Sequence, residues 1–263
     1  MKGNTPDISF TLSFDQTKKE AAKERKKKGS MDDYGCRWMI IILSIILVIS
    51  SNGKTMSNPQ FTAMYAFGDS LTDPGNNNYL SSLAKANYLP YGVDFAQGPS
   101  GRFCNGRTSI DYLGEFVEIP VLLPYTSPTA TGKNVLKGVN YASAGGGILE
   151  ETGSNLGERF SLSQQVENFE NTLDQMRTLM EEEELRDHLA KALVVMALGS
   201  NDYINNYLQP SFYTTSFIYN PKEFADLLIT RYTRQILGWN EDPKDSRCTL
   251  QLCVQLFRLR FGP

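Results

Sequence analysis

The chain has 263 residues, and its 26 Lys and Arg against 29 Asp and Glu leave a formal net charge of −3. This balance excludes a strongly basic nucleic-acid-binding face, while 41% apolar residues exclude a wholly disordered chain. Four cysteines without a CxxC pair exclude a disulfide scaffold and a zinc-finger site, and a single histidine limits acid–base chemistry. The length suits one large domain or two small ones.

Residues 1–30 form a polar extension rich in lysine. They contain eight Lys and Arg against four Asp and Glu. Such a segment is typical of disorder, and its charge leaves a nuclear-localisation role open. For the chain as a whole we expect no nucleic-acid partner.

An uncharged apolar run, Trp38–Ile49, follows the extension. A bilayer-spanning helix needs about 20 apolar residues, so this run is short for that purpose. It matches the apolar part of a secretory signal that starts at Met31, with Arg37 before it and small residues after it. Residues 31–57 are therefore predicted to hold a cleaved signal peptide of a secreted protein, followed by a linker. The alternatives are a membrane anchor through residues 38–49 and a buried strand or helix.

The rest of the chain alternates short apolar runs with longer amphipathic ones. The apolar runs predict strands at 62–67, 139–142 and 193–198, and the amphipathic runs predict helices at 108–117, 162–180 and 221–237. Thr108 or Ser109, Ser161 and Asn220 are candidate helix caps. This alternation indicates an α/β fold with a mainly parallel sheet covered on both faces.

Three conspicuous loops follow the predicted strands. The first carries Ser70 and the second carries three successive glycines from Gly145. The third carries Asn201. Because the carboxyl ends of parallel strands share one edge of the sheet, we expect these loops to lie together. A serine with neighbouring backbone N–H groups and an asparagine amide is the layout of an oxyanion hole for acyl transfer.

Each of these residues also has an ordinary structural explanation. Taken alone, Ser70 is typical of a turn or cap, Asn201 of a helix cap, and the glycines of a tight turn or a phosphate-binding loop. No Gly-Lys-Ser/Thr or Rossmann spacing follows the glycines, and no Gly-x-Ser-x-Gly is present. The sequence therefore predicts no cofactor and argues against an α/β-hydrolase.

Four blocks of the sequence resemble one known family. They are Phe-Gly-Asp-Ser-Leu-Thr-Asp-Pro-Gly-Asn-Asn at 67–77, Gly-Arg-Phe-Cys-Asn-Gly-Arg-Thr at 101–108, Asn-Tyr-Ala-Ser-Ala-Gly-Gly-Gly at 140–147 and Gly-Ser-Asn-Asp-Tyr at 199–203. In this order they are similar to the plant GDSL esterases/lipases of the SGNH hydrolase superfamily, although Cys104 stands where the family commonly has Ser. The resemblance covers about residues 61–238.

The resemblance implies a flavodoxin-like, three-layer α/β/α sandwich and hydrolysis of small-molecule esters or lipids. By resemblance Ser70 is the nucleophile. The N–H groups of Ser70 and Gly145 and the side chain of Asn201 would stabilise the oxyanion. No cofactor is implied, and a membrane would be a partner only through an uncleaved N-terminal apolar segment.

The family also takes its general base from an Asp-x-x-His block, and no such block occurs in this sequence. The one histidine, His188, is predicted to be an exposed helical residue at the amino end of a strand. Residues 58–238 are therefore interpreted as a partial hydrolase domain, incomplete at its C-terminus, followed by an atypical tail at 239–263. The alternative hypotheses are a catalytically inactive family member and a membrane-tethered interaction protein.

Overall fold

A computed structural model describes residues 61–237 of the chain. The lysine-rich extension, the predicted signal or anchor and the tail from residue 239 lie outside the described residues. Between residues 61 and 237 there is no helix with the length and apolar character that crossing a bilayer requires.

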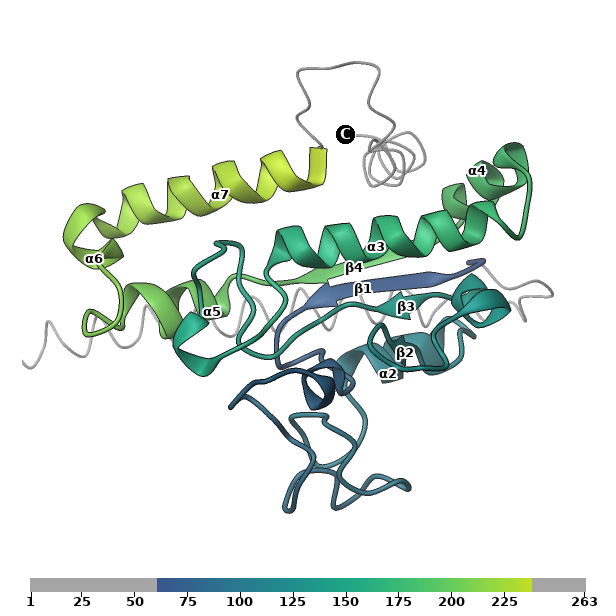
Figure 1. Cartoon of the computed structure of the whole chain (residues 1–263), viewed down its shortest axis with the longest axis horizontal. Helices are drawn as coiled ribbons and strands as arrows, with labels where there is room; N and C mark the ends of the chain where they lie inside the picture. Colours follow the sequence, from purple (N-terminus) through teal and green to yellow (C-terminus); the bar gives the residue numbers. More distant parts are fainter. Residues whose placement is uncertain (1–60, 238–263) are drawn as a thin grey trace, which may run out of the picture. The chain divides into compact units, whose positions relative to one another are not determined.

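The sheet has four parallel strands in the order β2-β3-β1-β4 (Figure 1). The strands are β1 (Met64–Gly68), β2 (Leu123–Pro124), β3 (Val139–Asn140) and β4 (Leu193–Ala197). β1 pairs with β4 along its whole length, from Met64 opposite Leu193 to Gly68 opposite Ala197. The predicted parallel sheet is confirmed, and β3, β1 and β4 are direct neighbours in it.

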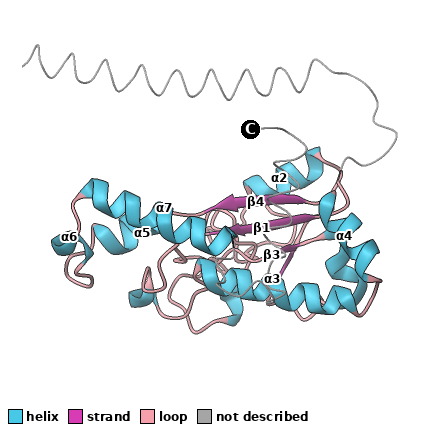
Figure 2. Cartoon of the chain, turned by 90° about the horizontal axis from the view of Figure 1, so that it is seen from above, coloured by secondary structure: helices cyan, strands magenta, loops and turns pink. Residues whose placement is uncertain are grey.

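Helices cover both faces of this sheet, as Figure 2 shows from above. The α-helices are α2 (Ser109–Phe116), α3 (Leu162–Arg177), α4 (Glu182–Ala190), α5 (Ser200–Asp202), α6 (Thr215–Ile218) and α7 (Pro221–Leu237). Short 3-10 helices lie at Asn76–Tyr79, Gly132–Lys137 and Ser154–Leu156, and a short π-helix lies at Tyr203–Tyr207.

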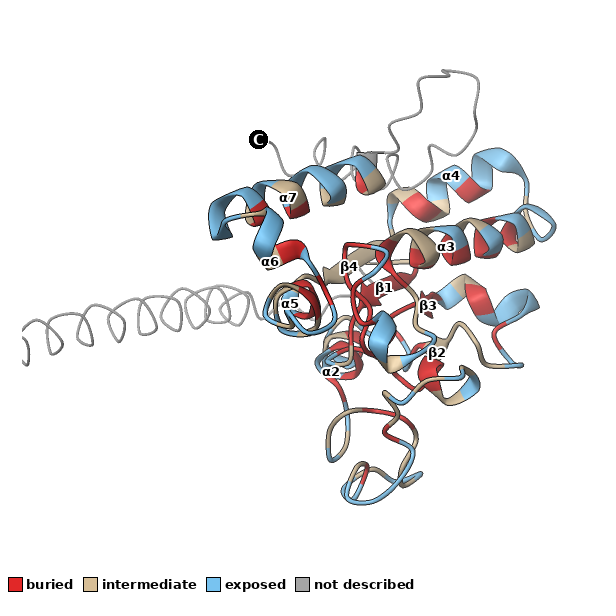
Figure 3. Cartoon of the chain, turned by 60° about the vertical axis from the view of Figure 1, so that its left-hand side comes forward, coloured by how far each residue is buried: buried red, intermediate tan, exposed pale blue. Residues whose placement is uncertain are grey.

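The two faces of β1 bury alternate side chains, because successive residues of a strand point to opposite sides. Tyr65 and Phe67 pack in the core shared with α3 and α7, whereas Met64 and Ala66 pack in the core shared with α2. All four side chains are fully buried. The result is the predicted arrangement of a sheet between two helical layers, with the buried residues concentrated around β1 (Figure 3).

All three predicted helix caps form as the sequence indicates. The Thr108 hydroxyl accepts the N–H of Asp111, whose carboxylate accepts the N–H of Thr108, so that α2 begins with a capping box. The Ser161 hydroxyl accepts the N–H of Gln164 at the start of α3. At the start of α7, the Asn220 side chain accepts the N–H groups of Lys222 and Glu223, both at 3.0 Å. α3 ends at Arg177, three residues before the predicted end, and β3 is two residues shorter than predicted.

β4 differs from its prediction as a buried strand. All five of its residues are only half-buried, whereas every residue of β1 is buried. The reason is its position in the sheet: β1 pairs with one edge of β4, and no described strand pairs with the other. The apolar composition of 193–198 thus identified a strand correctly but did not reveal that it lies at an edge.

A buried ion pair fastens the long loop before α2 to that helix. Arg102 donates from Nε and Nη2 to the two carboxylate oxygens of Asp111, at 2.8 and 3.2 Å, and both side chains are less than a tenth exposed. Burial alone would raise the pKa of Asp111, but the hydrogen bonds from Arg102 and Thr108 outweigh burial and lower the pKa.

Replacing Asp111 with Asn should lower the free energy of unfolding by about 3 kcal/mol, because it leaves the Arg102 guanidinium buried without its counter-charge. Urea denaturation would measure the loss. The matched control is Glu115→Gln at the exposed Arg107–Glu115 pair, where the loss should stay below about 1 kcal/mol. Equal losses in the two variants would contradict this account of Arg102.

Candidate functional site

The three loops that the sequence predicts to lie together do so at the carboxyl ends of the strands. β3, β1 and β4 are adjacent, so the segments that leave their carboxyl ends start side by side. The N–H of Ser143 donates to the carbonyl of Gly68 at 3.1 Å, which extends the β1–β3 pairing into the loops. α5 begins directly after β4 at the same edge (Figure 1).

Ser70 lies two residues beyond the end of β1. It is half-buried, and neither its hydroxyl nor its N–H has a hydrogen-bond partner among residues 61–237. The strand end before it is held by α3: the Gln165 amide accepts the N–H of Gly68 and donates to its carbonyl, both at 2.9 Å. A fixed backbone therefore presents a hydroxyl that no described residue engages.

Asp69 links the Ser70 loop to the loop after β4. Its carboxylate accepts the hydroxyl of Ser200 at 2.6 Å and the N–H of Leu71 at 3.0 Å. Ser200 immediately precedes Asn201. Ser70 follows Asp69 in the chain, so this contact holds Ser70 and Asn201 at the ends of neighbouring strands.

Asp73 links the Ser70 loop to the glycine loop after β3. Its buried carboxylate accepts the N–H groups of Gly75 and Asn76, each at 2.7 Å, and that of Ala144 at 3.0 Å. Burial raises the pKa of Asp73 to about 6, and these backbone hydrogen bonds oppose the rise. Ala144 directly precedes Gly145.

Asp202 completes the set by linking the loop after β4 to the loop after β3. Its carboxylate accepts the N–H groups of Ile148 and Leu149 at 2.8 and 2.9 Å and the hydroxyl of Thr152 at 2.8 Å. Burial raises the pKa of Asp202, while the same hydrogen bonds act in the opposite direction. Each pair among the three loops is thus bridged by one aspartate, and Asp69, Asp73 and Asp202 are hereafter called the aspartate bridges.

The two other predicted oxyanion residues lie on bridged loops. The Asn201 amide donates to the carbonyl of Gly146 at 2.8 Å and accepts from the amide of Asn205 at 2.7 Å. Gly145 has a φ of 81°, a left-handed conformation that favours glycine. Its N–H has no partner in the described part of the chain. Backbone N–H groups left unpaired in this way are the donors that can stabilise an oxyanion.

Comparison with known proteins decides the family. The sequence pattern of the GDSL-like lipase/acylhydrolase family matches residues 64–239. The chain belongs to this family.

Several Arabidopsis thaliana relatives support the assignment. The GDSL-family chain is 49% identical over 201 residues to GDSL esterase/lipase At5g08460, covering 76% of this chain and 51% of the relative. It is 48% identical over 199 residues to At1g71250 and 47% identical over 201 residues to GDSL esterase/lipase 7, covering 53% and 55% of them. The chain spans about half the length of the curated relatives it matches.

His188 lies at the amino ends of the strands, whereas Ser70 lies at their carboxyl ends. It belongs to α4, which leads into the amino end of β4, and its carbonyl accepts the hydroxyl of Thr62 just before β1. The five residues of β1, about 17 Å of strand, separate Thr62 from the Ser70 loop. The predicted exposure of His188 is wrong: the residue is half-buried, and burial lowers the pKa of its imidazole.

The aspartate bridges and Gln165 are site residues that reasoning from the sequence did not single out. Asp69, Asp73 and Asp202 each lie within three residues of Ser70 or Asn201, and this repeated placement was the available signal. Gln165 gave no signal, because its role depends on α3 packing across the end of β1. Between residues 61 and 237, no three His, Cys, Asp or Glu side chains gather in a group that could hold a metal ion.

The raised pKa of Asp73 predicts a pH-dependent contribution to stability. The folded state binds a proton at this carboxyl below a pKa of about 6, while the unfolded chain binds it only below the ordinary value of 3.8. Stability from this group therefore falls as the pH rises. The unfolding free energy of the native chain relative to Asp73→Asn should drop by about 2 kcal/mol between pH 4 and pH 7.

Urea denaturation of both proteins at the two pH values measures this difference. The exposed Asp187 supplies the control, since Asp187→Asn should show no such change relative to the native chain. A native-to-Asp73→Asn difference that is the same at both pH values would refute the assignment.

Proposed function

We propose that the chain is a serine ester hydrolase that acts on small-molecule esters or lipids. Ser70 serves as the nucleophile, and the N–H groups of Ser70 and Gly145 with the Asn201 amide stabilise the oxyanion. The observation that carries the proposal is the gathering of these residues on three bridged loops at one sheet edge. The named esterase/lipase relatives support the same reaction class.

In this reaction the Ser70 oxygen attacks the acyl carbon, and the carbonyl electrons move onto the oxygen, forming an oxyanion to which the unpaired N–H groups donate hydrogen bonds. Collapse of this intermediate expels the alcohol, which takes up a proton, and leaves an acyl-serine. Attack by water on the acyl-serine then releases the carboxylic acid and restores the hydroxyl. Each oxyanion donor is worth about 3 kcal/mol of transition-state stabilisation.

Proton transfer from Ser70 is the weak step in this chain. The sequence has one histidine, His188, which lies at the other edge of the sheet. Loss of a triad base typically lowers the rate by about 10⁴ to 10⁶. This observation favours a second candidate function: a chain that binds esters at the same site and turns them over very slowly or not at all.

Incubation with an organophosphonate and assay with 4-nitrophenyl acetate separate the two candidates. An active serine hydrolase should be labelled at Ser70, as mass spectrometry of peptides would show, and Ser70→Ala should lose at least 100-fold in ester turnover. His188→Gln is the matched control and should leave turnover unchanged, because His188 is remote from Ser70.

Each outcome has a direct interpretation. Equal turnover by the native chain and Ser70→Ala would reject Ser70 as the nucleophile. An unlabelled Ser70 in a folded protein would establish the second candidate in place of the first.

We propose in addition that residues 31–57 comprise a secretory signal, cleaved near Lys54, and a linker to the hydrolase domain at 58–238, which the atypical tail at 239–263 follows. The support is the short apolar run 38–49 with its flanking residues. Expression in plant cells should give a secreted protein whose N-terminus, read by peptide sequencing, lies near Lys54. Recovery of the uncut chain in the membrane fraction after a carbonate wash would instead support the membrane-tethered alternative.

A further inference from the structure

We propose that Asn105 and Gly106 form a modification site, at which the side-chain amide of Asn105 is lost by ring closure onto the main chain. Water is the one co-reactant, and the product is an aspartyl or isoaspartyl residue at position 105. Such a covalent change alters the charge and the path of the chain. The inference does not depend on the proposed ester chemistry, because no residue of that site takes part.

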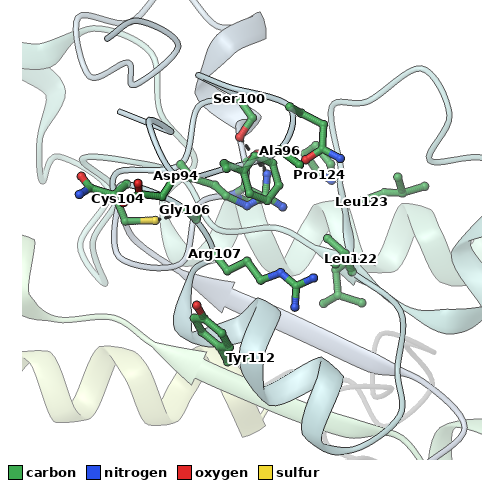
Figure 4. A pocket seen from close by; sticks show the side chains of 16 residues that line it. Asp94, Ala96, Ser100, Cys104, Gly106, Arg107, Tyr112, Leu122, Leu123 and Pro124 are labelled. Atoms are coloured by element: carbon green, nitrogen blue, oxygen red, sulfur yellow. Dashed lines mark hydrogen bonds between the residues drawn. The ribbon is translucent and has the colours of Figure 1, made fainter. Parts of the chain in front are cut away.

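The Asn105–Gly106 pair lies in the wall of a cavity. The cavity has a volume of about 1000 Å³ and is formed by the long loop before α2, by α2 itself and by the approach to β2. Its wall includes Pro74, from the loop that carries Ser70, and both residues of the pair. Figure 4 shows Gly106 beside Asp94 and Cys104 at one end of this cavity. Water in the cavity therefore has access to the pair.

The two groups that must react are both free. The Asn105 side chain is exposed and has no hydrogen-bond partner among residues 61–237, so its carboxamide can turn toward the main chain. The main-chain N–H of Gly106 has no acceptor in this part of the chain either. Ring closure removes the hydrogen of that N–H. In this loop the reaction therefore costs no hydrogen bond at the attacking nitrogen.

Glycine at position 106 leaves the path of attack open. Ring closure brings the Asn105 carboxamide against the residue that follows, and a side chain on that residue would obstruct it. The surroundings add no obstruction of their own, because even a Cβ built on Gly106 would have its closest contact at 3.7 Å, with Asp94. The pair thus combines an unhindered nitrogen with a mobile carboxamide.

One hydrogen bond opposes the reaction. The N–H of Asp94 donates to the main-chain carbonyl of Asn105 at 2.7 Å. This carbonyl turns when Asn105 rotates about its Cα–C bond to close the ring, so the hydrogen bond must break. Losing one such bond slows the reaction by about fivefold relative to an unfolded chain. The folded loop therefore slows the modification without preventing it.

The chemistry proceeds in two balanced steps. In the first, the deprotonated main-chain nitrogen of Gly106 attacks Cγ of Asn105. A new C–N bond forms, the bond from Cγ to the side-chain nitrogen breaks, and this nitrogen takes up a proton from solvent and leaves as ammonia. In the second step, one water molecule opens the five-membered imide. Opening at Cγ gives aspartate, whereas opening at the main-chain carbonyl gives isoaspartate.

Either product changes the wall of the cavity. A carboxylate at position 105 adds one negative charge to the formal net charge of −3, close to the exposed Asp94. Isoaspartate also adds a carbon to the main chain between residues 105 and 106, so that the hydrogen bond from Asp94 loses its geometry. The site therefore records the age of the molecule as charge and loop conformation.

Incubation of the purified full chain at pH 7 and at pH 8, followed by tryptic peptide mapping, tests the proposal. Trypsin releases Asn105 in the peptide 103–107, and the other Asn-Gly pair of the sequence, at 52–53, in a different peptide. Conversion raises the mass of the 103–107 peptide by about 1 Da. An isoaspartyl methyltransferase with labelled S-adenosylmethionine detects the isoaspartyl product. Conversion should be about tenfold faster at pH 8, because the attacking nitrogen must first lose its proton.

Asn87 is the matched control within the same molecule. It is exposed in the same loop and has no hydrogen-bond partner among the described residues, but Tyr88 follows it in place of a glycine. Its tryptic peptide, 86–102, contains no other asparagine. Asn105 should convert at least tenfold faster than Asn87, since the tyrosine side chain obstructs ring closure.

Gly106→Ala tests the role of the glycine itself. Gly106 does not have a positive φ and a Cβ there has room, so the alanine fits without backbone strain. Conversion at Asn105 should fall at least tenfold. Equal conversion of Asn105 and Asn87, an unchanged rate in Gly106→Ala, or products without isoaspartate would each overturn the proposal. If Gly106→Ala does not fold, the comparison of Asn105 with Asn87 in the native chain still decides.

Discussion

The constraint on which the site depends is the need to pair buried backbone N–H groups where the strands end. Beyond the last ladder hydrogen bond, the chain must find other acceptors for these groups, because an unpaired buried N–H is costly. Asp73 and Asp202 meet this need with carboxyl oxygens that accept two or three backbone donors each. Since the donors belong to neighbouring loops, satisfying them also holds the loops together.

Against this background, the unpaired N–H groups of Ser70 and Gly145 are distinctive. The residues beside them are engaged: Leu71 donates to Asp69, and Ala144 donates to Asp73. Donors that are held in position by their neighbours, yet left without a partner, need no rearrangement to donate hydrogen bonds to a developing oxyanion. That is the physical requirement for an oxyanion hole, and it explains why the aspartate bridges matter to a site whose chemistry they do not perform.

The same fold separates the serine from the one histidine of the sequence. In a parallel sheet, all strands have their amino ends on one side and their carboxyl ends on the other. Ser70 follows the carboxyl end of β1, and His188 precedes the amino end of β4, so no side-chain movement can bring them together. The proposed nucleophile and oxyanion donors therefore lie at the opposite ends of the strands from the imidazole.

Local sequence patterns predicted the strands β1, β3 and β4 and the helices α2, α3 and α7 with their caps, because these depend on residues close together in the chain, but they did not predict β2. Thr108 and Ser161 cap their helices by accepting N–H groups three residues along the chain. The side chains of residues 64–67 point alternately into the two cores because a strand is pleated. The motifs also placed Ser70, Gly145 and Asn201 at strand exits. Only the tertiary structure decided that β4 is a half-buried edge strand, that Gln165 fastens the end of β1, that aspartates bridge the loops and that a cavity opens beside Pro74. Each of these features joins segments dozens of residues apart. Such contacts are set by strand order and packing, which the local periodicity of the sequence does not reveal.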